Sequence, residues 1–160
     1  MIGKIEGFIL TPRGFVDGTL SHRQGHIGPI EGPLIPDERA RDEAHTFVLP
    51  GFIDSHVHGG GGRDTMEGGD AIDRIARMHV RHGTTSLLAT TMTAPLPELE
   101  FAMSAIGEAC RMRRSGAARV LGVHLEGPYI NPRKLGRNPT LYGPRRSPRS
   151  SRCTRLRRSC

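Results

Sequence analysis

The sequence predicts an α/β protein in which strands and helices alternate, preceded by a small β region. Three observations lead to this prediction. Residues 1–50 hold short apolar runs separated by turn residues, residues 51–136 alternate strand-like with helix-like patterns, and residues 137–160 show neither pattern. Alternating β and α segments are typical of parallel strands joined by helical crossovers. A chain of 160 residues also has the usual length of one domain.

The first half of the chain predicts strands and turns. Short runs such as KIEGFIL and HIGPI lie among Gly, Pro and Asp, and helical periodicity is absent, so residues 1–50 are expected to form part of a small β structure. FVLPGFIDSHVH then predicts an approach segment, a Pro-Gly turn and a buried strand containing Phe52, Ile53 and Val57. The stretch GGGGRDTMEGGD that follows is expected to be a flexible loop without a phosphate-binding fingerprint.

The middle of the chain predicts two helices and two further strands. Apolar residues at three- and four-residue spacing predict a helix over 70–82, which ends at Gly83, and TTSLLATT at 84–91 predicts a buried strand. Residues 94–116 predict a second helix, with acidic residues at its start and Arg at its end. ARVLGVHLEG at 118–127 predicts the third strand.

Two strand ends carry residues that can bind a metal ion. His56 and His58 close the first strand of this β-α-β-α-β pattern, and Glu126 closes the third. The side-chain period of a strand is two, so both imidazoles face the same side. Carboxyl ends of parallel strands meet at one edge, which places all three residues together. Two imidazoles and a carboxylate suit a divalent ion such as zinc, although each pattern taken alone is equally compatible with a structural role.

Other polar residues in the same region are interpreted as structural. His124 faces the same side as Glu126 and is expected to support the site rather than bind a metal. Asp54 lies deeper in the first strand and is expected to have a supporting or core role. His79 and His82 fall on the predicted helix, where His82 suits the helix dipole. Cys110 is expected to be a buried small residue.

The charge of the chain is concentrated at its end. The formal net charge is +7, but eight of the 23 basic residues fall in residues 137–160, which hold no acid, so 15 basic and 16 acidic residues remain. A nucleic-acid binder that uses this Arg-rich tail is therefore a remote alternative. The N-terminus lacks a signal-peptide pattern, no apolar run is long enough for a membrane span, and three scattered cysteines form no disulfide framework. We therefore expect a cytoplasmic protein.

Three segments together resemble one enzyme family. LPGFIDSHVHGGGG resembles the first barrel strand of the amidohydrolase superfamily, and GTTSLLATTMTAP with GVHLEGPYINPRKLG resembles the N-terminal part of the N-acetylglucosamine-6-phosphate deacetylases. The resemblance covers residues 1–136. It implies part of a small β-sandwich in residues 1–50 and the first three strands and two helices of a (β/α)8 barrel in residues 51–136. A different amidohydrolase, acting on a cyclic amide or ureide, is the alternative.

The resemblance also implies an activity and a site. The family reaction is metal-dependent hydrolysis of the N-acetyl group of N-acetylglucosamine 6-phosphate to glucosamine 6-phosphate and acetate. Carried onto this chain, His56, His58 and Glu126 match metal-ligand positions, with zinc expected and iron as the alternative. Members of the family are expected to be homo-oligomers that bind an amino-sugar phosphate. The family's catalytic aspartate and two further metal-binding histidines lie on later strands, so no catalytic residue can be assigned here and the isolated chain is expected to be inactive.

Residues 137–160 are expected to be a disordered tail that is read out of frame. They hold little apolar content, which cannot offset the entropy of ordering the chain. In the family, PRKLG is commonly followed by a sequence like AQP, whereas this chain continues Arg137-Asn138-Pro139. Compatible codons for residues 136–140 exist in which one restored G after the first codon changes the reading to G-A-Q-P-D. A one-nucleotide deletion or a sequencing error would explain this tail.

Overall fold

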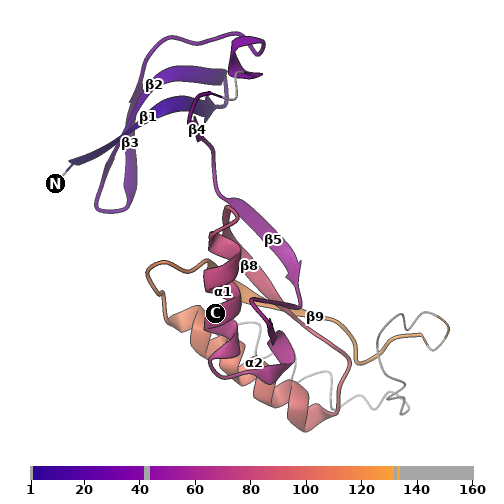
Figure 1. Ribbon diagram of the computed structural model, residues 1–160. Helices are drawn as coiled ribbons and strands as arrows, with labels where there is room; N and C mark the ends of the chain where they lie inside the picture. Colours follow the sequence, from indigo (N-terminus) through magenta and orange to yellow (C-terminus); the bar gives the residue numbers. More distant parts are fainter. Residues whose placement is uncertain (1, 42–43, 132, 134–160) are drawn as a thin grey trace. The chain divides into compact units, whose positions relative to one another are not determined.

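The chain folds into two units, Met1–Pro50 and Gly51–Cys160, which are described separately. The computed structural model describes residues 2–41, 44–131 and 133 (Figure 1). The Arg-rich segment 137–160, for which disorder and a shifted reading frame are predicted, lies outside the described residues. None of the helices in the described part of the chain is long and apolar enough to cross a membrane.

The first unit is one four-stranded sheet in the order β3-β2-β1-β4. β1 (Ile2–Thr11), β2 (Gly14–Arg23) and β3 (His26–Glu31) form an antiparallel meander, and β4 (Phe47–Val48) adds to β1 in parallel. The short 3-10 helix η1 (Arg39–Arg41) lies in the segment that leads to β4. The expected β region is therefore present as a single sheet among the described residues.

Buried residues lie on both faces of this sheet, because the consecutive residues Phe8 and Ile9 of β1 are 0% and 1% exposed. Phe8 is fully buried and packs with Ile35, Ala40 and the half-buried Phe15. The Phe8 ring also stacks on the His45 ring, with centroids 4.3 Å apart. β2 was not predicted because GFVDGTLSHR mixes its apolar residues with Gly, Asp and Ser, which favour turns.

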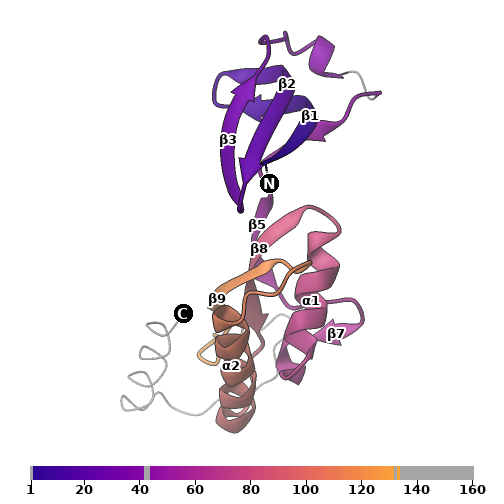
Figure 2. The same cartoon turned by 90° about the vertical axis from the view of Figure 1, so that its left-hand side faces the viewer.

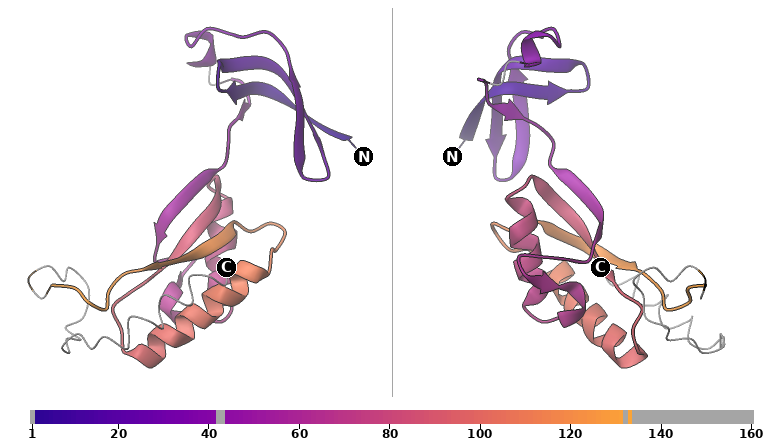
Figure 3. Two further views of the ribbon diagram at one scale, coloured as in Figure 1. Left: turned by 180° about the vertical axis from the view of Figure 1, so that it is seen from behind. Right: turned by 45° about the vertical axis from the view of Figure 1, so that its right-hand side comes forward.

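The second unit is a three-stranded parallel sheet with two helices. β5 (Phe52–Val57), β8 (Thr84–Thr91) and β9 (Arg119–Leu125) lie side by side in chain order, which Figure 3 shows from behind. α1 (Ala71–Val80) connects β5 to β8, and α2 (Leu96–Arg111) connects β8 to β9 (Figure 2). The sequence predicted each of these elements to within a few residues. Both helices and all three strands contribute to one apolar core: Val57, Ile72, Ile75, Ala76, Leu87, Ala89, Ile106, Ala118 and Val120.

The strand β5 is more exposed than the sequence predicts. Only Val57 is buried, at 3% exposed, whereas Phe52 and Ile53 are 61% and 70% exposed. Among the described strands β8 is the one that pairs with β5, so one edge of β5 stays uncovered there and the prediction of a buried strand is wrong for Phe52 and Ile53.

The glycine-rich segment after β5 is regular rather than a loop. β6 (Gly59–Gly60) and β7 (Arg63–Asp64) form a two-residue hairpin, and the 3-10 helix η2 (Thr65–Glu67) follows. Gly61 and Gly62 take φ values of 61° and 77°, which a type I′ hairpin turn requires at both central positions. The glycines thus serve this turn, a use that the sequence analysis did not consider.

Candidate metal centre

The end of β5 presents two imidazoles on one side of the strand. Val57 points into the core, so His56 and His58 on either side of it point away from the core together. Their Nε2 atoms lie 3.0 Å apart, and their ring planes are inclined at 71°. The predicted alternation of the His-Val-His segment is therefore present in the structure.

Glu126 brings a carboxylate to the same point from the other edge of the sheet. It directly follows β9, which is separated from β5 by the central strand β8. Its Oε2 atom lies 3.3 Å from His56 Nε2 and 3.2 Å from His58 Nε2. The three residues that the sequence predicted as neighbours thus form a triangle of two nitrogens and one oxygen.

The size of this triangle fits a single divalent cation. Zinc binds nitrogen and carboxylate oxygen at about 2.0–2.2 Å, so two ligand atoms at tetrahedral angles lie roughly 3.3–3.5 Å apart. The observed separations of 3.0–3.3 Å are close to this value. Two imidazoles with one glutamate are also a donor set that catalytic zinc sites use. The residues present can therefore hold a divalent metal ion.

The second nitrogen of His58 is not satisfied within the described part of the chain. His58 Nδ1 is buried and has no hydrogen-bond partner there. If Nε2 of His58 faces a cation with its lone pair, the ring proton lies on Nδ1. Metal-binding histidines usually donate this proton to a carboxylate or a carbonyl, and none of the described residues takes that place at His58.

Two residues next to the triangle support it, as the sequence analysis expected. His124 Nδ1 lies 2.9 Å from the Ser55 carbonyl oxygen, and its ring centroid is 4.6 Å from that of His56. The Asp54 carboxylate accepts a hydrogen bond from the His56 backbone amide at 3.0 Å. Both side chains hold the His56 region of β5 and neither belongs to the triangle.

Further contacts to the end of β5 were not foreseen from the sequence. His79 on α1 is half-buried, and its Nε2 lies 3.1 Å from the Gly59 carbonyl oxygen, so it has a partner beside the site. The hydroxyls of Thr65 and Thr90 contact the backbone of Val57. The buried, hydroxyl-bearing run at the end of TTSLLATT is the one sequence signal that could have indicated Thr90. The exposed His82 makes no contact with the triangle.

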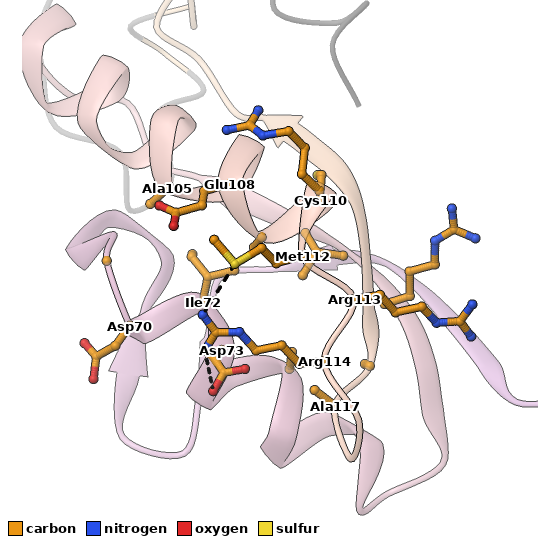
Figure 4. Close-up of a pocket in the computed structure, with 17 residues that line it drawn as sticks. Asp70, Ile72, Asp73, Ala105, Glu108, Cys110, Met112, Arg113, Arg114 and Ala117 are labelled. Atoms are coloured by element: carbon orange, nitrogen blue, oxygen red, sulfur yellow. Dashed lines mark hydrogen bonds and ion pairs between the residues drawn. The ribbon is translucent and has the colours of Figure 1, made fainter.

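A cavity of about 420 Å³ lies elsewhere in this unit, between α1, α2 and the start of β9 (Figure 4). Its lining mixes charges: Asp73 pairs with Arg77 at 2.8 Å and with Arg114 at 3.3 Å. Cys110 contributes to this lining and is half-buried against the apolar core, so it is less buried than expected. The cavity lies at the opposite end of β9 from Glu126, and no residue of the triangle lines it.

Comparison with known proteins gives consistent relatives. N-acetylgalactosamine-6-phosphate deacetylase of Escherichia coli O157:H7 is 39% identical over 133 residues, which are 82% of this chain and 34% of that protein. N-acetylglucosamine-6-phosphate deacetylase of Lysinibacillus sphaericus is 41% identical over 100 residues, 60% of this chain and 25% of that protein. The chain thus spans between a quarter and a third of the length of these curated relatives.

The fold has a matching relative among solved structures. The crystal structure of N-acetylglucosamine-6-phosphate deacetylase from Thermotoga maritima superposes with a TM-score of 0.69 at 29% identity, over 86% of this chain and 35% of that one. The family model described as "Amidohydrolase family" matches residues 47–159, a range that contains the His-Val-His segment and Glu126 and runs into the Arg-rich segment. This chain belongs to the amidohydrolase family.

Proposed function

We propose that this chain is the N-terminal part of a metal-dependent deacetylase of amino-sugar phosphates. The reaction is hydrolysis of the N-acetyl group of N-acetylglucosamine 6-phosphate, which gives glucosamine 6-phosphate and acetate. The observation that carries the proposal is the triangle of His56, His58 and Glu126. The substrate class is taken from the names of the relatives. Among the described residues no sugar-binding contact can be recognised.

His56, His58 and Glu126 would hold the metal ion, for which we propose zinc, with iron as the alternative. A divalent ion in this place lowers the pKa of a bound water and polarises the amide carbonyl of a substrate. The residues of this chain fix the position at which that happens, at the carboxyl ends of β5 and β9. A general base must take the proton from the attacking water and return it to the leaving amine. The family resemblance assigns that base to a later strand.

We propose further that the three strands are the first three of a (β/α)8 barrel. The order β5-β8-β9 follows the chain, and a helix stands between each pair of parallel strands. Such a barrel takes about 250 residues. Residues 1–50 would then be one part of a small β-sandwich, and the complete enzyme would be a cytoplasmic homo-oligomer, as the family resemblance suggests.

The galactosamine epimer is the second candidate substrate. The relative from Escherichia coli O157:H7, 39% identical over 82% of this chain, is named for N-acetylgalactosamine 6-phosphate. The two sugars differ in the configuration of one ring hydroxyl and carry the same acetamide and phosphate. His56, His58 and Glu126 would hold the metal ion near the acetamide in either sugar, so the residues that bind the sugar ring would decide between the two substrates.

One experiment tests activity and reading frame together. The genomic DNA across codons 134–140 is resequenced, and the frame-restored protein and the 160-residue chain are both assayed for acetate and free amine. We expect the restored protein to deacetylate N-acetylglucosamine 6-phosphate and the 160-residue chain to release no acetate, because the resemblance places its general base beyond residue 136. The epimer and a cyclic ureide are included as substrates.

Each part of the proposal has a result that contradicts it. Acetate release by the purified 160-residue chain would overturn the inactivity of that chain. Turnover of the cyclic ureide alone would overturn the substrate class. Genomic DNA that encodes residues 137–160 as they stand would mean that the chain is the product of a broken gene, and an extra nucleotide would make the tail an error.

A further inference from the structure

The ladder between β5 and β8 is irregular between Asp54 and Val57, the interval that contains His56. β5 pairs with β8 in the order Phe52 with Thr84, Ile53 with Ser86 and Asp54 with Leu87, and the register then shifts before Val57. Buried backbone N–H and C=O groups need hydrogen-bond partners wherever the ladder does not supply them. The His-Val-His segment lies at this irregular place, so other groups must fix its peptide planes.

Two buried hydroxyls supply those partners. The Val57 N–H donates to Thr90 Oγ1 at 2.8 Å, and Thr65 Oγ1 donates to the Val57 carbonyl at 3.3 Å. Thr65 and Thr90 are both 0% exposed. Thr65 also donates its own backbone N–H to the His58 carbonyl at 2.7 Å. The peptide groups on both sides of Val57 are therefore held by Thr90 from β8 and Thr65 from η2.

The element that carries Thr65 is itself fixed locally. Asp64 caps η2: its carboxylate accepts from the Met66 N–H at 2.8 Å, while its own N–H donates to Glu67 Oε1 at 2.8 Å. This reciprocal arrangement is a capping box, which satisfies backbone donors at the start of a helical turn. Thr65 therefore reaches Val57 from a short but well-defined support.

We propose that Thr65 and Thr90 are positioning residues of the metal centre. Their hydroxyls hold the backbone of Val57 so that the imidazoles of His56 and His58 converge on one cation before it binds. This inference rests on the proposed function, because it assumes that the two imidazoles bind a metal. Outer partners that orient metal ligands typically change metal affinity about 10- to 100-fold when they are removed.

The chain offers a matched control one residue from Thr90. Thr91 is also 0% exposed, and its Oγ1 has no hydrogen-bond partner in the described part of the chain. Thr and Val have nearly the same shape, so Thr90→Val and Thr91→Val both replace a buried hydroxyl with a methyl group. Only Thr90→Val removes the acceptor of the Val57 N–H.

The experiment measures zinc affinity and amide exchange in the 160-residue chain. Zinc is titrated calorimetrically into the wild type, Thr90→Val, Thr65→Val, Thr91→Val and the conservative Thr90→Ser. Hydrogen exchange at the Val57 amide is measured in metal-free protein, and circular dichroism checks that each variant is folded. We expect Thr90→Val and Thr65→Val to bind zinc about 10- to 100-fold more weakly. Thr90→Ser should bind nearly as tightly as the wild type, and Thr91→Val should match it.

The exchange measurement separates the inference from the proposed function. In Thr90→Val the Val57 amide should exchange faster than in the wild type, and in Thr91→Val it should not. Equal zinc affinity in Thr90→Val, Thr65→Val and Thr91→Val would overturn the positioning role. If the wild type binds no zinc, the proposed metal centre fails and the positioning role fails with it; faster exchange in Thr90→Val would then show only that Thr90 holds the Val57 backbone. If the wild type binds zinc, unchanged exchange at the Val57 amide in Thr90→Val overturns the inference alone.

Discussion

β5 and β8 are neighbours in one parallel sheet, yet β8 contributes buried core residues whereas β5 leads into the candidate metal centre. β8 is the central strand, and Leu87, Ala89, Thr90 and Thr91 are all fully buried. β5 buries only Val57 and leaves most of its length exposed, but it carries His56 and leads directly into His58. A strand can therefore supply chemistry without supplying much of the core, provided that its buried neighbour holds it in place.

The largest expected difference between the two strands is in stability. Leu87→Ala removes a side chain that is 0% exposed and should lower the free energy of unfolding by about 2–5 kcal/mol, because it loses burial and leaves a cavity. Ile53→Ala changes a side chain that is 70% exposed and should cost less than about 1 kcal/mol. Urea titrations followed by circular dichroism measure both. Equal losses of unfolding free energy in the two variants would contradict the view that β8 contributes more to stability than β5.

The affinity for zinc is expected to depend on the histidines at the end of β5. Structural zinc sites bind with roughly 10–16 kcal/mol from about four ligands, so the loss of one ligand costs about 3 kcal/mol, more than 100-fold in affinity. His58→Ala should show this loss. The exposed His82 at the end of α1 provides the control, and His82→Ala should bind zinc as the wild type does. Competition with a chromophoric chelator measures the affinity, and a similar loss in both variants would mean that zinc binds elsewhere.

The smallest effect is expected at the segment that joins β5 to α1. Asp64 and Asp70 each precede a helical element, but only Asp64 accepts a capping hydrogen bond. Asp70 instead pairs with Arg63 at 2.9 Å and is 71% exposed. Asp64→Ala should therefore lower stability by about 1 kcal/mol and Asp70→Ala by about 0.5 kcal/mol or less. The midpoints of urea unfolding measure both losses. A larger loss in Asp70→Ala than in Asp64→Ala would show that the capping box has no stabilising role.

The sequence predicted the elements whose burial repeats regularly. The strand at Thr84–Thr91 was predicted with the bounds that the structure has, and α1, α2 and β9 lie within their predicted ranges. The two helices pack one side on the core, which leaves a period that can be read in the sequence. The strand at Thr84–Thr91 is buried on both sides at its end and is recognised by its short continuous run of apolar and Thr residues. β2 and the glycine hairpin were missed because their Gly and Asp residues favour turns as well as strands. The exposure of Phe52 and Ile53 depends on which strands flank β5, which no local pattern contains.

The residues of the candidate site also fall into those that the sequence predicts and those that it does not. His56, His58 and Glu126 could be brought together from sequence, since alternation fixes the side of a strand and parallel pairing fixes the edge. Thr65 could not be recognised as a support of these residues, and for Thr90 the sequence offers only the hydroxyl-bearing run at the end of TTSLLATT. Their role depends on the register shift between Asp54 and Val57, which is a property of two paired strands. The tail at residues 137–160, outside the described residues, remains a prediction.

The triangle also has a consequence for the order of events during synthesis. The two imidazoles leave the ribosome early, together with the hairpin and capping box that follow them, whereas Glu126 emerges only after both helices and the third strand. A nascent chain can thus offer a cation two nitrogens long before it can offer the carboxylate. Tight retention of a metal ion would therefore report that β9 has docked beside β8.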